Sequence, residues 1–383
     1  MKRAAAAAIS LMTGLAMLTG CSRAEVEETI QPLVADAIEE SDSEAEAVKE
    51  EDESPLIPEI DTDIKIHAGS RIAVVSKCVK GEYWKMVKKG MEDAVKEINK
   101  AYGYKKDDQI TMTFEGPDNE EDVETQINTI DAVIAENPDV LCISASDMDS
   151  CEAQLEAAKE NGIPVIAFDS NVAEKKLVKA YRGTDNVQVG KMAAYQLGSA
   201  LGKMGKVAVF SAQQKTKSIQ DRVEGFMNNI GKYGDIEVVE TIYSDQVDDM
   251  EASMKEVLEK YPTLDGVFCT NAEITEMYLN LEKSDEHDAP ALVGVDATTK
   301  QQEAIRNGEE IGCVSQQPYA MGYQTIWAAV ETTAPKKSVV IEKNVLSNPA
   351  WIDADCLDDL DYSGYLYTCL LYTSDAADDR ISV

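Results

Sequence analysis

The strongest constraint on the fold is an alternation of two sequence patterns that runs from Lys65 to Ser315. Short runs of apolar, often β-branched residues alternate with longer segments whose apolar residues recur every three or four positions. The short runs predict strands and the long segments predict amphipathic helices. Because the strand runs are apolar on both faces, we expect sheets covered by helices on both sides. The alternation therefore predicts repeated βα units and an α/β fold with parallel sheets.

The predicted strands are too many for one sheet. The blocks 71–168 and 206–315 each supply four or five βα units, which predicts two doubly wound parallel-sheet lobes. The expected strands are Arg71–Ser76, Ile110–Phe114, Val140–Ser144, Val165–Phe168, Lys206–Phe210, Glu237–Tyr243, Gly266–Thr270, Ala291–Val295 and Gly312–Ser315, and the expected helices include Tyr83–Tyr102, Val123–Glu136, Cys151–Asn161, Val187–Leu201 and Met250–Tyr261.

Polar and aromatic residues follow the predicted strands. Ligands of such sheets bind at the carboxyl ends of the strands, so two facing lobes would gather these residues around one cleft. Aromatic rings can cover the C–H face of a sugar, while carboxylates, amides and an arginine exchange hydrogen bonds with its hydroxyls. The candidate ligand-binding residues are Tyr83, Trp84, Asp169, Arg222, Asn271, Asp296 and Gln316.

Each of these residues also has an ordinary structural interpretation. Tyr83 and Trp84 could begin a helix and pack inward, and a lone arginine on a helix is commonly solvated or salt-bridged. The aspartates could cap strand ends, and Asn271 could be a turn residue. Their joint placement at successive strand ends favours the binding site.

Several segments resemble the periplasmic-binding-protein type 1 superfamily, specifically the ribose/galactose-like solute-binding proteins of ABC transporters. The resemblance covers about residues 65–367. It rests on the order and spacing of the segments 163–169, 184–190, 222–226, 270–271, 293–296 and 316–323.

The resemblance implies two lobes joined by a three-segment hinge. Lobe 1 would comprise residues 66–184 plus 317–346, and lobe 2 residues 185–316 plus 347–368. The chain would cross between the lobes near Gly183–Asp185, Gln316–Pro318 and Leu346–Pro349.

The resemblance also implies roles for the candidate residues. Tyr83 and Trp84 would sandwich a sugar ring, Asp169 would supply the first acid, and Arg222 would hold ring or hydroxyl oxygens. Asn271, Asp296 and Gln316 would supply the polar contacts of the second lobe and hinge.

The chain departs from the ribose-type pattern at three places. Gly81 replaces an asparagine before the aromatic pair, Ser170 replaces an arginine after the first acid, and the loop 244–246 offers no aromatic residue. We therefore expect a monosaccharide or related polyol and do not assign ribose.

The N-terminus carries the pattern of an export signal. Lys2-Arg3 precedes an apolar run from Ala4 to Met17, which is too short to span a bilayer. The following Leu-Thr-Gly-Cys21 resembles the lipobox of bacterial lipoproteins. That resemblance implies a signal peptide at residues 1–20, acylation of Cys21 (palmitate), and a protein anchored by lipid at the extracytoplasmic face of the cell membrane, in the periplasm or at the cell surface.

Residues 21–65 predict an acidic, disordered tether. From Ser22 to Lys65 there are sixteen acidic and three basic residues, so the segment repels itself and has little to bury. The whole chain carries a formal charge of −35, which argues against binding to nucleic acid. Only two histidines exist, which excludes a histidine-rich metal site, and we expect no cofactor.

The segment 369–383 resembles a translated sequencing adapter, and we expect it to contribute nothing to the fold.

These patterns predict a monomeric solute-binding lipoprotein that delivers its ligand to an ABC transporter permease by hinge closure. A sugar or autoinducer receptor module feeding a membrane sensor is the main alternative. A transcription regulator of this fold would need a basic helix-turn-helix in place of the lipobox and tether. No motif of an enzyme class such as G-x-S-x-G or H-E-x-x-H is present, so we expect no enzyme.

Overall fold

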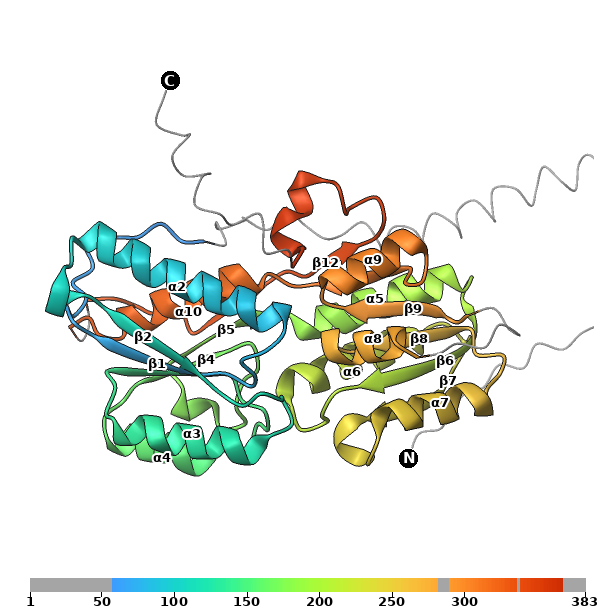
Figure 1. Cartoon of the computed structure of the whole chain (residues 1–383), viewed down its shortest axis with the longest axis horizontal. Coiled ribbons are helices and arrows are strands. Elements are labelled where there is room, and N and C mark those ends of the chain that lie inside the picture. The colour runs from blue at the N-terminus through green and yellow to red at the C-terminus, as the bar shows by residue number, and fades with distance from the viewer. Residues whose placement is uncertain (1–56, 282–288, 336–337, 368–383) are drawn as a thin grey trace, which may run out of the picture. The chain divides into compact units, whose positions relative to one another are not determined.

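The computed structural model describes residues 57–281, 289–335 and 338–367. The expected signal peptide, Cys21, most of the expected tether and the segment 369–383 lie outside the described residues. Within them the chain forms two six-stranded sheets flanked by helices (Figure 1). The α/β architecture with parallel sheets that the sequence predicts is confirmed.

The first sheet, with its helices, is called lobe 1 below. Its strand order is β11-β5-β4-β3-β1-β2, and its neighbouring strands are parallel. Helices α2 and α10 cover one face and α3 and α4 the other. The elements are β1 (Arg71–Val75), α2 (Glu82–Tyr102), β2 (Thr111–Glu115), α3 (Val123–Ala135), β3 (Val140–Ile143), α4 (Glu152–Glu160), β4 (Val165–Phe168), β5 (Ala180–Thr184), α10 (Pro318–Glu331) and β11 (Asn344–Ser347).

The second sheet, with its helices, is called lobe 2. Its order is β12-β10-β9-β8-β6-β7, and only β12 runs antiparallel to its neighbour among the described strands. Helix α5 packs on one face, α7 and α8 on the other, and α6 contributes to both clusters. The elements are α5 (Asn186–Ala200), β6 (Met204–Ser211), α6 (Lys217–Ile230), β7 (Asp235–Tyr243), α7 (Met250–Lys260), β8 (Gly266–Cys269), α8 (Ala272–Leu279), β9 (Ala291–Val295), α9 (Thr299–Asn307), β10 (Gly312–Ser315) and β12 (Ala350–Ile352).

The chain passes between the two sheets at three places. It leaves β5 for α5 at Asp185, leaves β10 for α10 at Gln316 and Gln317, and leaves β11 for β12 between Ser347 and Ala350. Two of these passages are hydrogen-bonded to each other, since the amide of Asp185 donates to the carbonyl oxygen of Ser347 at 3.1 Å.

Three strands of the structure, β5, β11 and β12, were not predicted from the sequence. Ala180–Thr184 contains Arg182 and Gly183 and so lacks an apolar run, although Arg182 is buried. Asn344–Ser347 and Ala350–Ile352 are only four and three residues long. In all three the strand arises from pairing with a neighbour, which a local pattern does not encode.

The end of the expected tether is part of the packed chain. Ile60 and Ile64 pack against the hydrophobic cluster of lobe 1, and the hydroxyl of Tyr102 donates to the carbonyl oxygens of Asp61 and Ile64. The predicted tether boundary at residue 65 is therefore too late, because two isoleucines among many acids gave too weak a periodic signal.

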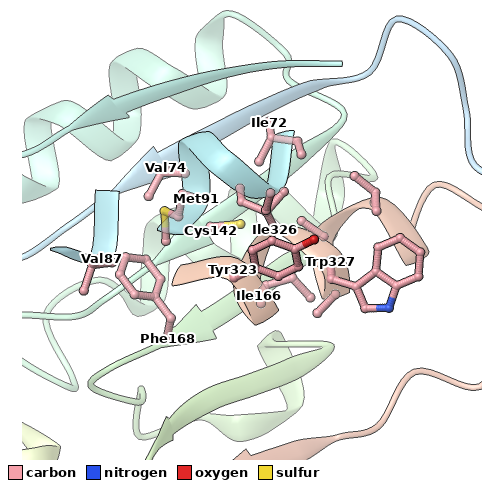
Figure 2. Close-up of a cluster of buried hydrophobic side chains, with 14 of the residues drawn as sticks. Ile72, Val74, Val87, Met91, Cys142, Ile166, Phe168, Tyr323, Ile326 and Trp327 are labelled. Atoms are coloured by element: carbon pink, nitrogen blue, oxygen red, sulfur yellow. The ribbon is translucent and has the colours of Figure 1, made fainter. Parts of the chain in front are cut away.

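The core of lobe 1 lies between α2, α10 and the sheet. Figure 2 shows side chains of both helices meeting those of the strands. The labelled residues are Val87 and Met91 of α2, Tyr323, Ile326 and Trp327 of α10, and Ile72, Val74, Cys142, Ile166 and Phe168 of the sheet. Over the described residues, none of the helices combines the length and the apolar character needed to cross a bilayer.

Glycines bring the paired helices into backbone contact. In lobe 2, a Cβ on Gly190 of α5 would lie 1.9 Å from the carbonyl oxygen of Arg222, and one on Gly225 of α6 would lie 2.2 Å from that of Val187. In lobe 1, a Cβ added to Gly90 of α2 would lie 2.0 Å from the carbonyl oxygen of Tyr319 in α10. The α5–α6 contact thereby fixes the backbone that carries Arg222.

We predict that Gly190→Ala destabilises the protein by about 3 kcal/mol, because the helices must separate to admit the methyl group. Calorimetric melting temperatures measure the effect. Gly234→Ala is the control, since no atom lies within 4 Å of its added Cβ. Equal melting temperatures for the two variants would contradict the packing account.

Candidate functional site

All seven candidate ligand-binding residues line one cavity of about 320 Å³. Tyr83 and Trp84 lie in the first turn of α2, and Asp169 directly follows β4. Arg222 lies on α6, and the other three follow β8, β9 and β10. The cavity lining also includes Lys77, Cys78, Lys80, Gly81, Glu82, Asp118, Asn119, Glu120, Ile219, Ala272, Glu273, Glu276 and Thr298.

Asp169 is a buried carboxylate held by three donors of lobe 1. Its Oδ1 accepts from the hydroxyl of Tyr83 at 2.6 Å, and its Oδ2 accepts from Ser144 at 2.8 Å and lies 3.0 Å from Nζ of Lys77. Burial alone raises the pKa of Asp169, but Lys77 and the two hydroxyls bring that pKa below its usual value. The group is therefore an ionised acceptor at neutral pH.

Asp296 is the corresponding buried carboxylate of lobe 2, and it also has three donors. Its Oδ1 accepts from the amide of Gln316 at 2.7 Å and from the hydroxyl of Tyr367 at 2.9 Å, and its Oδ2 accepts from the backbone N–H of Ala272 at 2.9 Å. A carboxylate has about four acceptor sites, so each aspartate retains capacity for one more donor. A ligand hydroxyl is such a donor.

Both aspartates have left-handed backbone conformations, with φ of 55° at Asp169 and 79° at Asp296. This region is unfavourable for residues other than glycine and is found most often where surrounding contacts enforce it. In both lobes the strained residue directly follows a central strand, so the strain turns a carboxylate toward the cavity.

Arg222 is a buried cation that uses two of its three guanidinium nitrogens in hydrogen bonds within the described part of the protein. Its Nε donates to Asn186 at 2.9 Å and its Nη1 to the carbonyl oxygen of Thr270 at 2.7 Å. Within the described residues Nη2 has no protein acceptor, so it can donate to an oxygen in the cavity. Asn271 caps α8 through Oδ1, which accepts from the backbone N–H of Ile274 at 3.0 Å. Its side-chain nitrogen has no acceptor among the residues that the structure describes, so it can also donate to a ligand.

The two aromatic residues lie edge to face. The rings of Tyr83 and Trp84 are 5.1 Å apart at 88°, and Nε1 of Trp84 donates to Glu120 at 2.8 Å. The hydroxyl of Tyr83 donates to Asp169. The sandwich of a sugar ring between Tyr83 and Trp84 stays a prediction.

Sequence reasoning missed three residues of the site. Lys77 is 4% exposed and joins Asp169 to Glu120, whose Oε2 lies 3.7 Å from Nζ. Glu120 belongs to the acidic run 118–122, which carries no strand-end signal. Tyr367 is buried and outside the cavity lining, and it holds Asp296 through its hydroxyl. Lys77 could have been found, because it stands just after the first strand; Tyr367 carries no such signal.

Glu273 lies in the cavity lining near other carboxylates. Burial, and then the charges of Glu120, Glu121 and Glu276, raise the pKa of Glu273 to about 7. The carboxyl group of Glu273 is therefore partly protonated near neutral pH, and it can donate a hydrogen bond when protonated and only accept when ionised. Among the described residues no group of three or more His, Cys, Asp or Glu side chains is placed to hold a metal ion.

Hydrogen bonds join the two lobes around the cavity. Glu82 accepts from the backbone N–H of Thr299 at 2.7 Å, at the start of α9. On another side, Thr216 donates to the carbonyl oxygen of Ser146 at 2.5 Å, and Gln213 donates to that of Glu120 at 2.6 Å. These contacts connect α2 and the loops of lobe 1 to lobe 2.

Residues 72–337 match the model of the periplasmic binding protein domain family. The chain belongs to this family. The expected membership and the expected fold class, with two parallel-sheet lobes of periplasmic binding protein type 1, are confirmed.

Curated proteins similar to this chain include several that bind sugars or a sugar alcohol. The ribose import binding protein of Bacillus subtilis is 26% identical over 220 residues, which cover 57% of this chain and 71% of that protein. The xylitol-binding protein of Mycolicibacterium smegmatis is 24% identical over 55% of this chain and 60% of its own length. The match thus spans less than two thirds of some curated relatives.

Solved structures of solute-binding proteins agree in fold with this chain. An ABC transporter solute-binding protein from Agrobacterium vitis with bound D-fucose superimposes with a TM-score of 0.70 at 26% identity, covering 78% of this chain and 100% of that one. A carbohydrate transporter solute-binding protein from Agrobacterium radiobacter in complex with D-arabinose gives 0.68 at 25% identity, over 78% and 99%.

We predict that Lys77→Met costs about 3 kcal/mol of unfolding free energy at pH 7, because it leaves Asp169 buried without its counter-charge. In the unmodified protein the lowered pKa of Asp169 contributes stability above the usual aspartate range, and this contribution is lost as the pH falls through the lowered value. In Lys77→Met burial should raise the pKa of Asp169 above its usual value, because the counter-charge is gone. Asp169 of the variant then takes up a proton between pH 7 and pH 5. The loss of unfolding free energy relative to the unmodified protein should therefore be smaller at pH 5.

Urea unfolding at pH 7 and pH 5 measures both effects. Lys80→Met is the control, since Lys80 and Asp118 form an exposed ion pair that should contribute little. A deficit for Lys77→Met that is the same at both pH values would contradict the assignment.

Proposed function

We propose that this protein is an extracytoplasmic solute-binding lipoprotein that captures a monosaccharide or related polyol and delivers it to an ABC import permease. The observation that carries the proposal is the convergence of both lobes on one cavity. Buried Asp169 and Asp296 offer acceptors there, while Arg222 and Asn271 offer donors. The sugar-binding relatives support the same ligand class.

The residues of the cavity match the chemistry of a polyol. A hydroxyl donates one hydrogen bond and accepts others, so it can bridge a carboxylate and an arginine or amide. Trp84 adds an apolar surface for C–H groups. The volume of about 320 Å³ suits a small ligand. Binding without chemical conversion is the proposed role.

Hinge closure is the proposed mechanism, as it is for periplasmic binding proteins as a class. The ligand would bind between the lobes, and contacts such as that of Glu82 with Thr299 would favour the closed arrangement. A ligand shifts the open–closed equilibrium only by its preference for the closed state. The closed surface would then be recognised by the permease.

We predict that a sugar or polyol raises the melting temperature of the protein in a thermal-shift screen, whereas amino acids and nucleosides do not. The panel contains pentoses, hexoses, 6-deoxyhexoses, alditols and inositols. At one hundred times the dissociation constant a ligand stabilises the native state by about 2.7 kcal/mol. Asp296→Ala and Arg222→Ala should abolish the shift while keeping the secondary structure. A response only to amino acids or nucleosides would overturn the ligand class, and unchanged affinity in either variant would overturn the site.

Lipid anchoring of Cys21 is part of the proposal and rests on the sequence. We predict that the unmodified protein partitions into the membrane fraction and into the detergent phase of Triton X-114, whereas Cys21→Ser is found in the aqueous phase. Cys78→Ser is the control and should partition like the unmodified protein. Equal partitioning of the Cys21→Ser variant would rule out this anchor.

A further inference from the structure

The two lobes hold their aspartates in matching ways. In lobe 1 the hydroxyl of Tyr83 donates to Asp169 at 2.6 Å, and in lobe 2 the hydroxyl of Tyr367 donates to Asp296 at 2.9 Å. Burial and then the neighbouring carboxylate raise the pKa of each tyrosine well above its usual value. Both hydroxyls therefore stay protonated and act as donors.

The two tyrosines also contact each other. Their ring centroids are 6.0 Å apart at an angle of 56°, within the range of favourable aromatic pairs. A continuous chain of contacts thus runs from the carboxylate of lobe 1 through Tyr83 and Tyr367 to the carboxylate of lobe 2.

Tyr367 is well anchored for such a role. It is 1% exposed, and its backbone N–H donates to the carbonyl oxygen of Ala297 at 3.0 Å, one residue beyond Asp296. The preceding turn is fixed by Ser315, which donates to the carbonyl oxygen of Tyr365 at 2.6 Å. Tyr367 packs with the hydrophobic cluster of lobe 1 even though its hydrogen bonds go to lobe 2.

Tyr367 is absent from the cavity lining, so it can act on a ligand only through its neighbours. We propose that Tyr367 is a positioning residue for ligand binding, whose hydroxyl orients Asp296 and whose ring couples that carboxylate to Tyr83 and Asp169 in the other lobe. The proposal rests on the proposed sugar-binding function for its ligand and on the contacts above for its geometry. It makes the segment 353–367 part of the binding apparatus.

Two variants separate the hydroxyl from the ring. Tyr367→Phe removes the hydroxyl, and with it the hydrogen bond to Asp296, while Tyr367→Leu also removes the ring contact with Tyr83. Tyr362→Phe is the matched control, since Tyr362 lies in the same segment outside this chain of contacts. Calorimetric titration with the tightest sugar of the screen should show an affinity about tenfold lower for Tyr367→Phe and unchanged for the control.

A double-mutant comparison shows whether the effect passes through Asp296. Adding Tyr367→Phe to Asp296→Asn should weaken sugar binding no further, because the positioned carboxylate is already gone. A second full loss in the double variant would overturn the proposed route, since Tyr367 would then act by another path.

Hydrogen exchange of the protein without added sugar tests the geometry independently of the ligand. Tyr367→Phe should speed exchange severalfold in residues 294–298, and Tyr367→Leu should also speed it in residues 81–86, with the remaining sheet amides unchanged. If no sugar binds the unmodified protein, the proposed function fails while exchange still decides the positioning role. Unaltered exchange at 294–298, or an increase spread evenly over both sheets, would overturn it.

Discussion

Two buried carboxylates set the conditions that the rest of the site must meet. A charge removed from water is tolerated only when donors or a counter-charge surround it. Asp169 obtains these from Lys77, Tyr83 and Ser144. Within the part of the chain that the structure describes, Asp296 obtains hydrogen bonds alone, including one from Tyr367. Both residues have a left-handed backbone that turns the carboxylate out of the strand end. The fold maintains this strain because the acceptors it creates point into the cavity.

The donors that satisfy each aspartate come from separate segments of the chain, so the geometry of the cavity depends on the packing of whole elements. The close contact of α5 with α6 at Gly190 locates Arg222, and the contact of Glu82 with Thr299 ties α2 to the start of α9. A ligand whose hydroxyls donate hydrogen bonds to both carboxylates would therefore stabilise one arrangement of the two lobes. An anionic ligand would meet the carboxylates that crowd around Glu273.

Much of the fold was predictable from the sequence because parallel strands buried on both faces leave apolar runs. The strand Ala180–Thr184 was missed because Arg182 and Gly183 interrupt its pattern, and its place in the sheet comes from pairing with β4 and β11. The candidate site was predictable where residues follow strand ends, since topology brings such positions to one edge. Tyr367 was beyond sequence reasoning, because its contact with Asp296 joins positions 71 residues apart with no pattern between them.

A crystal structure with the tightest-binding sugar tests the central claim most directly. The account predicts one sugar between the lobes, with a hydroxyl within hydrogen-bonding distance of Asp169, another within that distance of Asp296, and an oxygen accepting from Nη2 of Arg222. A sugar that contacts the carboxylate of one lobe only, or that binds outside this cavity, would contradict it.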